Sequence, residues 1–105
     1  MKVLAIEKEV PGVVSAQFTG SLLQAEAAKA WELHQSMVLR ELYFTADTHH
    51  AVLSLECGGP EEARLYLAEL PLVQAGLIDF EIIPLVPYSG FARLFANEES
   101  TADSP

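Results

Sequence analysis

Residues 75–95 read AGLIDFEIIPLVPYSGFARLF and contain the longest apolar run of the chain. Seven large apolar side chains occupy the ten positions 77–86, and only two acids and Pro84 interrupt them. Such a high density of apolar residues is typical of a strand that lies between two neighbouring strands. We therefore expect the last strand of a sheet here. Pro84 and Pro87 have no backbone N–H to donate, so pairing should weaken from Pro84 onward and the strand should lie near a sheet edge there.

The segment after this strand is also apolar. Residues 88–95, YSGFARLF, carry three aromatic side chains in eight positions. A segment of this kind requires a surface to lie on, either on its own chain or on a partner. Together with a hydrophobic content of 50% and a positive mean hydropathy of +0.23, this predicts an oligomer interface, with a well-filled core as the alternative.

The length and charge of the chain limit its partners. Its 105 residues predict one domain, which we place at residues 1–96, followed by a disordered acidic tail at residues 97–105. The chain has 15 acidic residues against 6 basic ones, and the basic residues are scattered. A phosphate backbone is bound by clustered Lys and Arg, so neither nucleic acid nor an anionic membrane surface is an expected partner.

The N-terminal region gives an expectation for localisation. No apolar run approaches the roughly 18–20 residues of a spanning helix. Charged residues also follow the short apolar run at the N-terminus, where a signal sequence would have to continue. We therefore expect a cytoplasmic protein.

Three further strands and two helices are predicted. Strands are expected at residues 2–8, 38–46 and 51–57, and the polar connection between the last two predicts an antiparallel hairpin. One helix is expected at residues 21–35, and a second one begins at Pro60. The order is β-α-β-β-α-β, which is the ferredoxin-like α+β arrangement: a four-stranded antiparallel sheet with both helices on one face.

Period-two and period-3.6 patterns assign side chains to faces. In the first helix, Ser21 and Gln24 have the spacing of a capping box, and the stripe facing the sheet is expected to be Leu23, Ala27, Ala30, Trp31 and His34. In the first strand, Leu4 and Ile6 share one face. The face of the sheet without helices is then expected to carry Val3, Ala5, Glu7, Tyr43, Val52, Ser54 and Glu56.

That uncovered face favours assembly. Its mixture of apolar and acidic side chains is too apolar to leave wholly in water. Two such sheets facing each other would form a dimeric α+β barrel with a pocket for a small organic ligand. We therefore expect a homodimer or a higher homo-oligomer.

At this point the chain resembles the muconolactone isomerase-like and YciI-like group of dimeric α+β barrel proteins. The likeness rests on AEAAKAWELHQ leading into VLRELYFTAD, on LPLVQAGLIDFEIIPL, and on PYSGFARLF. It covers the chain from Met1 to about Ala96 and consists of packing signatures. The group includes a lactone isomerase that moves a double bond by proton transfer, and YciI-like members are associated with a His and Asp pair near the pocket. No such pair can be placed here.

Proton transfer next to a carbonyl requires a base and a second group that returns or stabilises charge. The candidate catalytic residues are Glu56, Glu7 and His34. Glu56 ranks first, because an inward position in the barrel near a second acid would raise the pKa of its carboxyl. The alternatives are that both glutamates are solvated surface charges and that His34 only bonds a backbone carbonyl at the helix end.

Candidate substrate-binding residues are Trp31, Tyr43 and Arg40. The guanidinium group of Arg40 could hold a substrate carboxylate through two hydrogen bonds, although an ion pair with Glu41 or Glu81 is the commoner outcome. No metal site and no cofactor are expected, because the chain lacks a Gly-rich phosphate loop, a nucleophile elbow and zinc spacing. Asp47, His49 and His50 are interpreted as a plain turn.

The single cysteine, Cys57, has no partner for an internal disulfide. We interpret it as a small buried apolar residue at a strand end rather than as a reactive thiol.

The function predicted by the resemblance is cofactor-free proton transfer, an isomerisation of a small organic molecule such as an unsaturated lactone. The alternative is a non-catalytic oligomeric protein that binds a small molecule or has a vestigial pocket.

Overall fold

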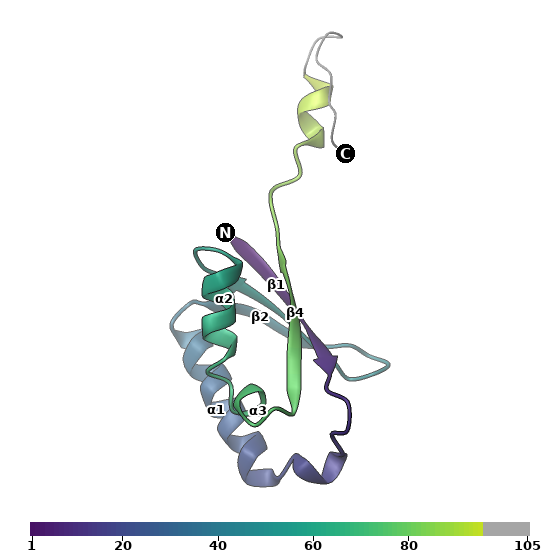
Figure 1. Ribbon diagram of the computed structural model, residues 1–105. Coiled ribbons are helices and arrows are strands. Elements are labelled where there is room, and N and C mark those ends of the chain that lie inside the picture. The colour runs from purple at the N-terminus through teal and green to yellow at the C-terminus, as the bar shows by residue number, and fades with distance from the viewer. Residues whose placement is uncertain (96–105) are drawn as a thin grey trace.

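The computed structural model describes residues 1–95 (Figure 1). Its longer elements are β1 (Lys2–Glu9), α1 (Gly20–Gln35), β2 (Leu39–Phe44), β3 (Ala51–Glu56), α2 (Pro60–Leu67) and β4 (Ile78–Pro84). Three short elements complete it: η1 (Ser15–Gln17), α3 (Pro71–Gln74) and η2 (Gly90–Leu94). The predicted tail at residues 97–105 lies outside the described residues. No helix among residues 1–95 is both long and apolar enough to cross a membrane.

The strands form one antiparallel sheet in the order β2-β3-β1-β4. The helices pack on one side of it, which confirms the predicted ferredoxin-like α+β fold (Figure 1). In the described part of the chain β4 pairs only with β1, so the expectation of a strand between two neighbours was wrong. As predicted, β4 ends at Pro84, where the missing N–H stops the ladder.

The face assignment of β1 was also wrong. Val3 and Ala5 are fully buried under the helices, opposite the core residues Leu55 and Leu53 of β3. Leu4 and the other even-numbered residues of β1 therefore lie on the uncovered face. Glu7 also lies on the helix-covered face, whereas the sequence pattern predicted it on the opposite face beside Glu56.

The buried stripe of α1 differs from the predicted one. Leu33 is the buried residue of this helix, whereas Trp31 is 60% exposed and Leu23 is 46% exposed. The helix begins one residue earlier than expected. Thr19 is its N-cap, and the Thr19 hydroxyl accepts a hydrogen bond from the Leu22 amide at 3.3 Å in place of the predicted Ser21 capping box.

The predicted hairpin and second helix are confirmed. β2 and β3 pair antiparallel, with a bulge between Leu39 and Glu41. Ala63 and Leu67 of α2 are buried, as is Leu70 just after it. The core lies between these helices and the sheet; its large fully buried side chains are Leu39, Leu55, Leu70 and Val3.

The apolar segment after β4 does not pack on the sheet. Residues 85–95, which we call the arm, leave the end of β4 and extend away from the rest of the chain (Figure 1). Large side chains along the arm are exposed, including Phe91 at 67%, Leu94 at 74% and Phe95 at 87%. Within residues 1–95, no surface of the single chain covers these side chains.

Candidate functional site

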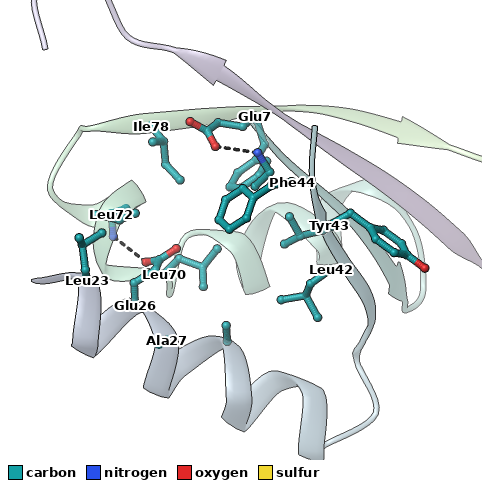
Figure 2. Close-up of a pocket in the computed structure, with 14 residues that line it drawn as sticks. Glu7, Leu23, Glu26, Ala27, Leu42, Tyr43, Phe44, Leu70, Leu72 and Ile78 are labelled. Atoms are coloured by element: carbon teal, nitrogen blue, oxygen red, sulfur yellow. Dashed lines mark hydrogen bonds between the residues drawn. The ribbon is translucent and has the colours of Figure 1, made fainter. Parts of the chain in front are cut away.

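An apolar cleft opens between α1 and the helix-covered face of the sheet (Figure 2). Its volume is about 340 Å³, at the small end of the range for ligand pockets. The cleft lies at the end of the sheet where β1 and β2 finish and β3 and β4 begin. Its lining residues are Glu7, Leu23, Glu26, Ala27, Ala30, Leu42, Tyr43, Phe44, Ala51, Leu53, Leu70, Leu72, Ile78 and Phe80.

Glu26 supplies a half-buried carboxylate to one wall of the cleft. It projects from α1, and its Oε1 accepts a hydrogen bond from the Leu72 amide at 2.9 Å. This bond also satisfies a free N–H in the first turn of α3 and so ties α3 to α1. Burial raises the pKa of the Glu26 carboxyl, the Leu72 bond opposes this shift, and the charge of Glu7 adds to it.

Glu7 supplies the second carboxylate, from the end of β1. Its Oε1 accepts a hydrogen bond from the Ala51 amide at 2.8 Å, where β3 begins. The two carboxylates lie on different walls, with the rings and aliphatic chains of Phe44, Ile78 and Leu70 around them (Figure 2). Among the described residues, the Oε2 atoms of Glu7 and Glu26 have no hydrogen-bond partner, so each glutamate keeps one oxygen for a ligand.

The electrostatics of the cleft follow from this composition. Its lining contains two carboxyl groups and no Lys, Arg or His. Two like charges near one apolar space disfavour double ionisation, so one carboxyl holds its proton to higher pH than usual. For Glu26 burial is the larger cause of its raised pKa, and the charge of Glu7 adds to it. The cleft therefore places a carboxyl with a raised pKa and a second carboxyl around one apolar space.

Glu56, the first-ranked candidate from sequence, lies at the opposite end of the sheet from the cleft. It is paired with Lys2 in the β1–β3 ladder, on the uncovered face. Its Oε2 lies 2.8 Å from the amino group of Met1. This bond lowers the pKa of the Glu56 carboxyl, which is opposite to the direction expected from the sequence. Glu7 and Glu56 are therefore not brought together.

His34 and Trp31 lie near the C-terminal end of α1, outside the cleft lining. The Nδ1 atom of His34 is 2.8 Å from the Leu39 carbonyl. A carbonyl only accepts, so Nδ1 carries the proton and the ring bonds the backbone, as the alternative interpretation held. Trp31 and His34 are neighbours, with ring centroids 5.8 Å apart, and both are exposed.

Tyr43 and Arg40 lie on the β2 edge of the sheet. Tyr43 forms part of the cleft wall, but its ring points away from the two glutamates (Figure 2). Its hydroxyl donates to Glu41 at 3.1 Å, and this bond raises the pKa of the phenol. The Nε atom of Arg40 donates to the Met37 carbonyl at 2.6 Å. Neither polar group reaches the space between Glu7 and Glu26.

The histidines of the hairpin contact different partners. The ring of His49 stacks on Phe44 with centroids 3.9 Å apart, and the Nε2 of His50 lies 3.1 Å from Glu9. Within residues 1–95, no three His, Cys, Asp or Glu side chains gather as a metal site would require. Cys57 is only half-buried, and its thiol lies 3.4 Å from the Gly59 carbonyl.

Sequence reasoning named Glu7 as a candidate, although on the other face of the sheet, and did not name Glu26. The available signal was the helical spacing of Leu22, Glu26 and Leu33, which places an acid on the apolar face of α1. A sheet-facing stripe that runs through Leu23 and Trp31 instead leaves Glu26 off the packing face of the helix. An acid on the packing face of a helix is uncommon unless it has a partner, and here the partner is a backbone amide far along the chain.

The order of the strands and the one-sided placement of the helices define a ferredoxin-like α+β protein. A solved structure with a similar fold is 5-chloro-2-hydroxyhydroquinone dehydrochlorinase (TftG) from Burkholderia phenoliruptrix AC1100, in complex with 2,5-dihydroxybenzoquinone. The TM-score is 0.62 at 19% sequence identity, over 86% of this chain and 98% of that chain. This likeness confirms the fold. Function has to be argued from the residues of the site. No protein-family model and no curated protein matches the chain.

Proposed function

We propose that the cleft binds a small uncharged oxygenated ring and transfers a proton on it without a cofactor. The observation that carries this proposal is the half-buried Glu26, whose pKa is raised by burial and by the Glu7 charge in an apolar cleft. A carboxyl whose pKa is raised holds its proton more strongly than an ordinary glutamate and is suited to act as a general acid. Glu7 is the general base, and its Oε2 is the receiving atom.

The proposed reaction is the migration of a double bond, as in isomerisation of an unsaturated lactone. Glu7 removes a proton from the carbon next to the ring carbonyl, and the electrons of the broken C–H bond enter the conjugated system. Glu26 returns a proton to the far carbon of that system, so the double bond shifts and no atom is gained or lost. Proton exchange between the two carboxyls and water then restores the starting state.

The charge of the cleft argues for an uncharged substrate. A ligand carboxylate would meet two acidic groups and no cation among the lining residues. Arg40, the residue expected to hold a substrate carboxylate, points elsewhere. We therefore place neutral lactones and related cyclic enones ahead of lactone acids. The ligand named for TftG, 2,5-dihydroxybenzoquinone, is also a small oxygenated ring, which supports this size class.

The test is proton exchange on α-angelica lactone, a neutral unsaturated lactone whose double bond migrates into conjugation. Proton NMR in D₂O follows both deuterium incorporation and the conjugated product. We expect acceleration by the wild-type protein and a loss of about 10²-fold or more in Glu26→Gln and in Glu7→Gln. Glu61→Gln is the matched control, because Glu61 is an exposed glutamate on α2 outside the cleft.

Two results would contradict proton transfer. One is a wild-type rate equal to that of buffer; the other is full activity in both Glu26→Gln and Glu7→Gln. Lactone-induced shifts of the Leu72 and Ala51 amide signals without any exchange would favour the alternative from the sequence, a binding protein that does not turn its ligand over.

A further inference from the structure

A second cavity is lined by the end of β1, the loop that follows β1 and the turn of the β2–β3 hairpin. Its volume is about 500 Å³, and among the described residues Glu7 alone lines both this cavity and the cleft. The apolar part of its lining consists of Val10, Val13, Val14, Phe18 and Leu77. Leu77 is buried, and Val13 and Phe18 pack against the core, so the folded chain fixes this apolar wall.

Three polar residues that line the same cavity form a hydrogen-bonded chain. The Oγ1 atom of Thr48 lies 3.0 Å from Nδ1 of His50, and Nε2 of His50 lies 3.1 Å from Oε1 of Glu9. The first contact joins neighbours in the turn, whereas the second spans 41 positions of sequence. Folding therefore places a hydroxyl, an imidazole and a carboxylate in series.

The direction of these bonds follows from the acid at one end. A carboxylate only accepts hydrogen bonds, so Nε2 of His50 donates to Glu9. In a neutral ring Nδ1 then carries no proton and accepts, so the Thr48 hydroxyl donates to it. The other acidic acceptor near this hydroxyl, Oδ1 of Asp47, is farther away at 3.4 Å. The proton of the Thr48 hydroxyl is thus directed at a base.

Both ends of the turn support this direction. The Oγ1 atom of Thr45 accepts a hydrogen bond from the His50 amide at 2.9 Å. It also lies 2.9 Å from Oγ1 of Thr48, to which its own hydroxyl is free to donate. The Thr48 amide donates to Oδ1 of Asp47 at 2.7 Å, which holds the backbone of the turn.

Thr48 is fixed in position and still accessible. Its side chain is exposed, whereas the side chain of His50 is only 26% exposed. An accessible hydroxyl that donates to an imidazole, with a carboxylate orienting the ring, is the arrangement of a nucleophile and its general base. Such an arrangement is recognised by geometry and not by position in the sequence.

We propose that Thr48, His50 and Glu9 form a second active site, which hydrolyses small uncharged esters through an acyl-Thr48 intermediate. Nδ1 of His50 takes the hydroxyl proton while Oγ1 of Thr48 attacks the carbonyl carbon of the ester. The bond from that carbon to the leaving oxygen then breaks, and His50 gives the proton to the departing alcohol.

The second half of the reaction restores the site. Nδ1 of His50 takes a proton from a water molecule, which attacks the acyl group on Thr48. The bond from the acyl carbon to Oγ1 breaks, and His50 returns the proton to Oγ1. One ester and one water therefore give one carboxylic acid and one alcohol, with no oxidant, reductant or further reactant.

The cavity limits the class of ester. Its apolar wall suits an aliphatic or aromatic acyl group of small size. Glu7 and Glu9 line it, and no Lys or Arg does so among the described residues, so an anionic ester is disfavoured. Glu9 acts through His50 and is a positioning residue. The reaction does not use the carboxyls of the cleft and so does not rest on the proposed function.

Hydrolysis of p-nitrophenyl butyrate tests the proposal. We expect saturable release of p-nitrophenol above the rate in buffer. A reaction stopped with acid should contain protein that is heavier by one butyryl group, which peptide mass spectrometry maps to Thr48. A rate equal to that of buffer would overturn the proposal, as would a butyryl group found only on other residues.

Variants of Thr48 and His50 test the two reacting groups. Thr48→Val keeps the branched shape without the hydroxyl and should lower kcat/KM by about 10²-fold, whereas Thr48→Ser keeps a hydroxyl and should hydrolyse the ester. His50→Gln should lower kcat by about 10²-fold. His34→Gln is the matched control, because His34 is an exposed imidazole on α1 outside both cavities. Equal losses in the two histidine variants would overturn the proposal.

The role of Glu9 is measured separately. The side-chain oxygen of Gln can still accept from Nε2, so Glu9→Gln keeps the ring in place and removes only the charge that stabilises the imidazolium. We expect kcat to fall by about 10-fold with KM unchanged, and no change in Glu61→Gln on α2. A wild-type kcat in Glu9→Gln would overturn the assignment of Glu9.

Circular dichroism checks that each variant is folded. If Thr48→Val does not fold, the acylated residue of the wild type and the activity of Thr48→Ser decide the question. All ester assays are made without lactone, so a protein that hydrolyses the ester but does not exchange protons on the lactone would contradict only the proposed function.

Discussion

Glu7 and Glu26 lie on different walls of one apolar cleft, and each gives one carboxylate oxygen to a backbone amide while keeping the other free. The bond from Leu72 to Glu26 spans 46 positions of sequence, and the bond from Ala51 to Glu7 spans 44. These bonds fix both carboxylates without neutralising either. Because the remaining lining is apolar apart from Tyr43, the two acids influence each other more strongly than exposed acids do.

The first prediction concerns the titration of Glu26 and Glu56. We expect the pKa of Glu26 to lie above its ordinary value of 4.5, because burial and Glu7 disfavour the charged form. The pKa of Glu56 should lie below 4.5, because the Met1 amino group stabilises the carboxylate. Carboxyl ¹³C NMR titration measures both in one sample. A Glu56 midpoint above that of Glu26 would contradict the assignment of the two sites.

The second prediction is the pH dependence of the Glu26→Gln variant. Below pH 4.5 the Glu26 carboxyl is mostly protonated in both the folded and the unfolded chain, so it does not lower the free energy of unfolding. As the pH rises, the unfolded chain ionises more readily, so the wild type loses stability relative to the variant until the folded pKa is passed. The amide oxygen of Gln can still accept from Leu72, so the variant keeps that bond.

Urea unfolding of both proteins from pH 4 to pH 7 tests this sign. The free energy of unfolding of Glu26→Gln minus that of the wild type should increase with pH. Glu61→Gln controls for the general effect of removing one negative charge. A difference that decreases with pH would mean that the Leu72 hydrogen bond outweighs burial.

The third prediction compares two neighbouring positions of α1. Leu33 is 5% exposed and packs in the core, so Leu33→Ala should lower the free energy of unfolding by about 2–5 kcal/mol. Trp31 is exposed, so Trp31→Ala should change the stability of the monomer by less than about 0.5 kcal/mol. Denaturation at low protein concentration separates these effects from association. A larger loss for Trp31→Ala would restore the stripe expected from the sequence.

The fourth prediction tests the orientation of β1. Val3 is fully buried, so Val3→Thr places a hydroxyl among apolar side chains and should cost about 1–3 kcal/mol. Ile6 lies on the uncovered face, where a hydroxyl reaches water, so Ile6→Thr should cost less. Thermal or urea unfolding of both variants provides the comparison. The reverse order would place the helices on the other face of this strand.

Local sequence patterns account for the order of the elements and hence for the fold. Gly and Pro separate the strands and helices, and Pro84 ends the last strand where its missing N–H predicts. The second helix starts at Pro60, as predicted, and buries Ala63 and Leu67, which are one helical turn apart. These features depend on neighbours within one element, so they can be read from the chain alone.

The faces and the site depend on contacts between distant elements. Both faces of β1 are apolar, so a period of two cannot choose between Val3 and Leu4, and only pairing with β3 and β4 decides which face meets the helices. Glu26 is an ordinary helical acid until packing brings the Leu72 amide and Glu7 to it. The amino acid order thus sufficed for the architecture, while the cleft and its pair of carboxylates exist only because the folded chain buries groups that the sequence keeps far apart.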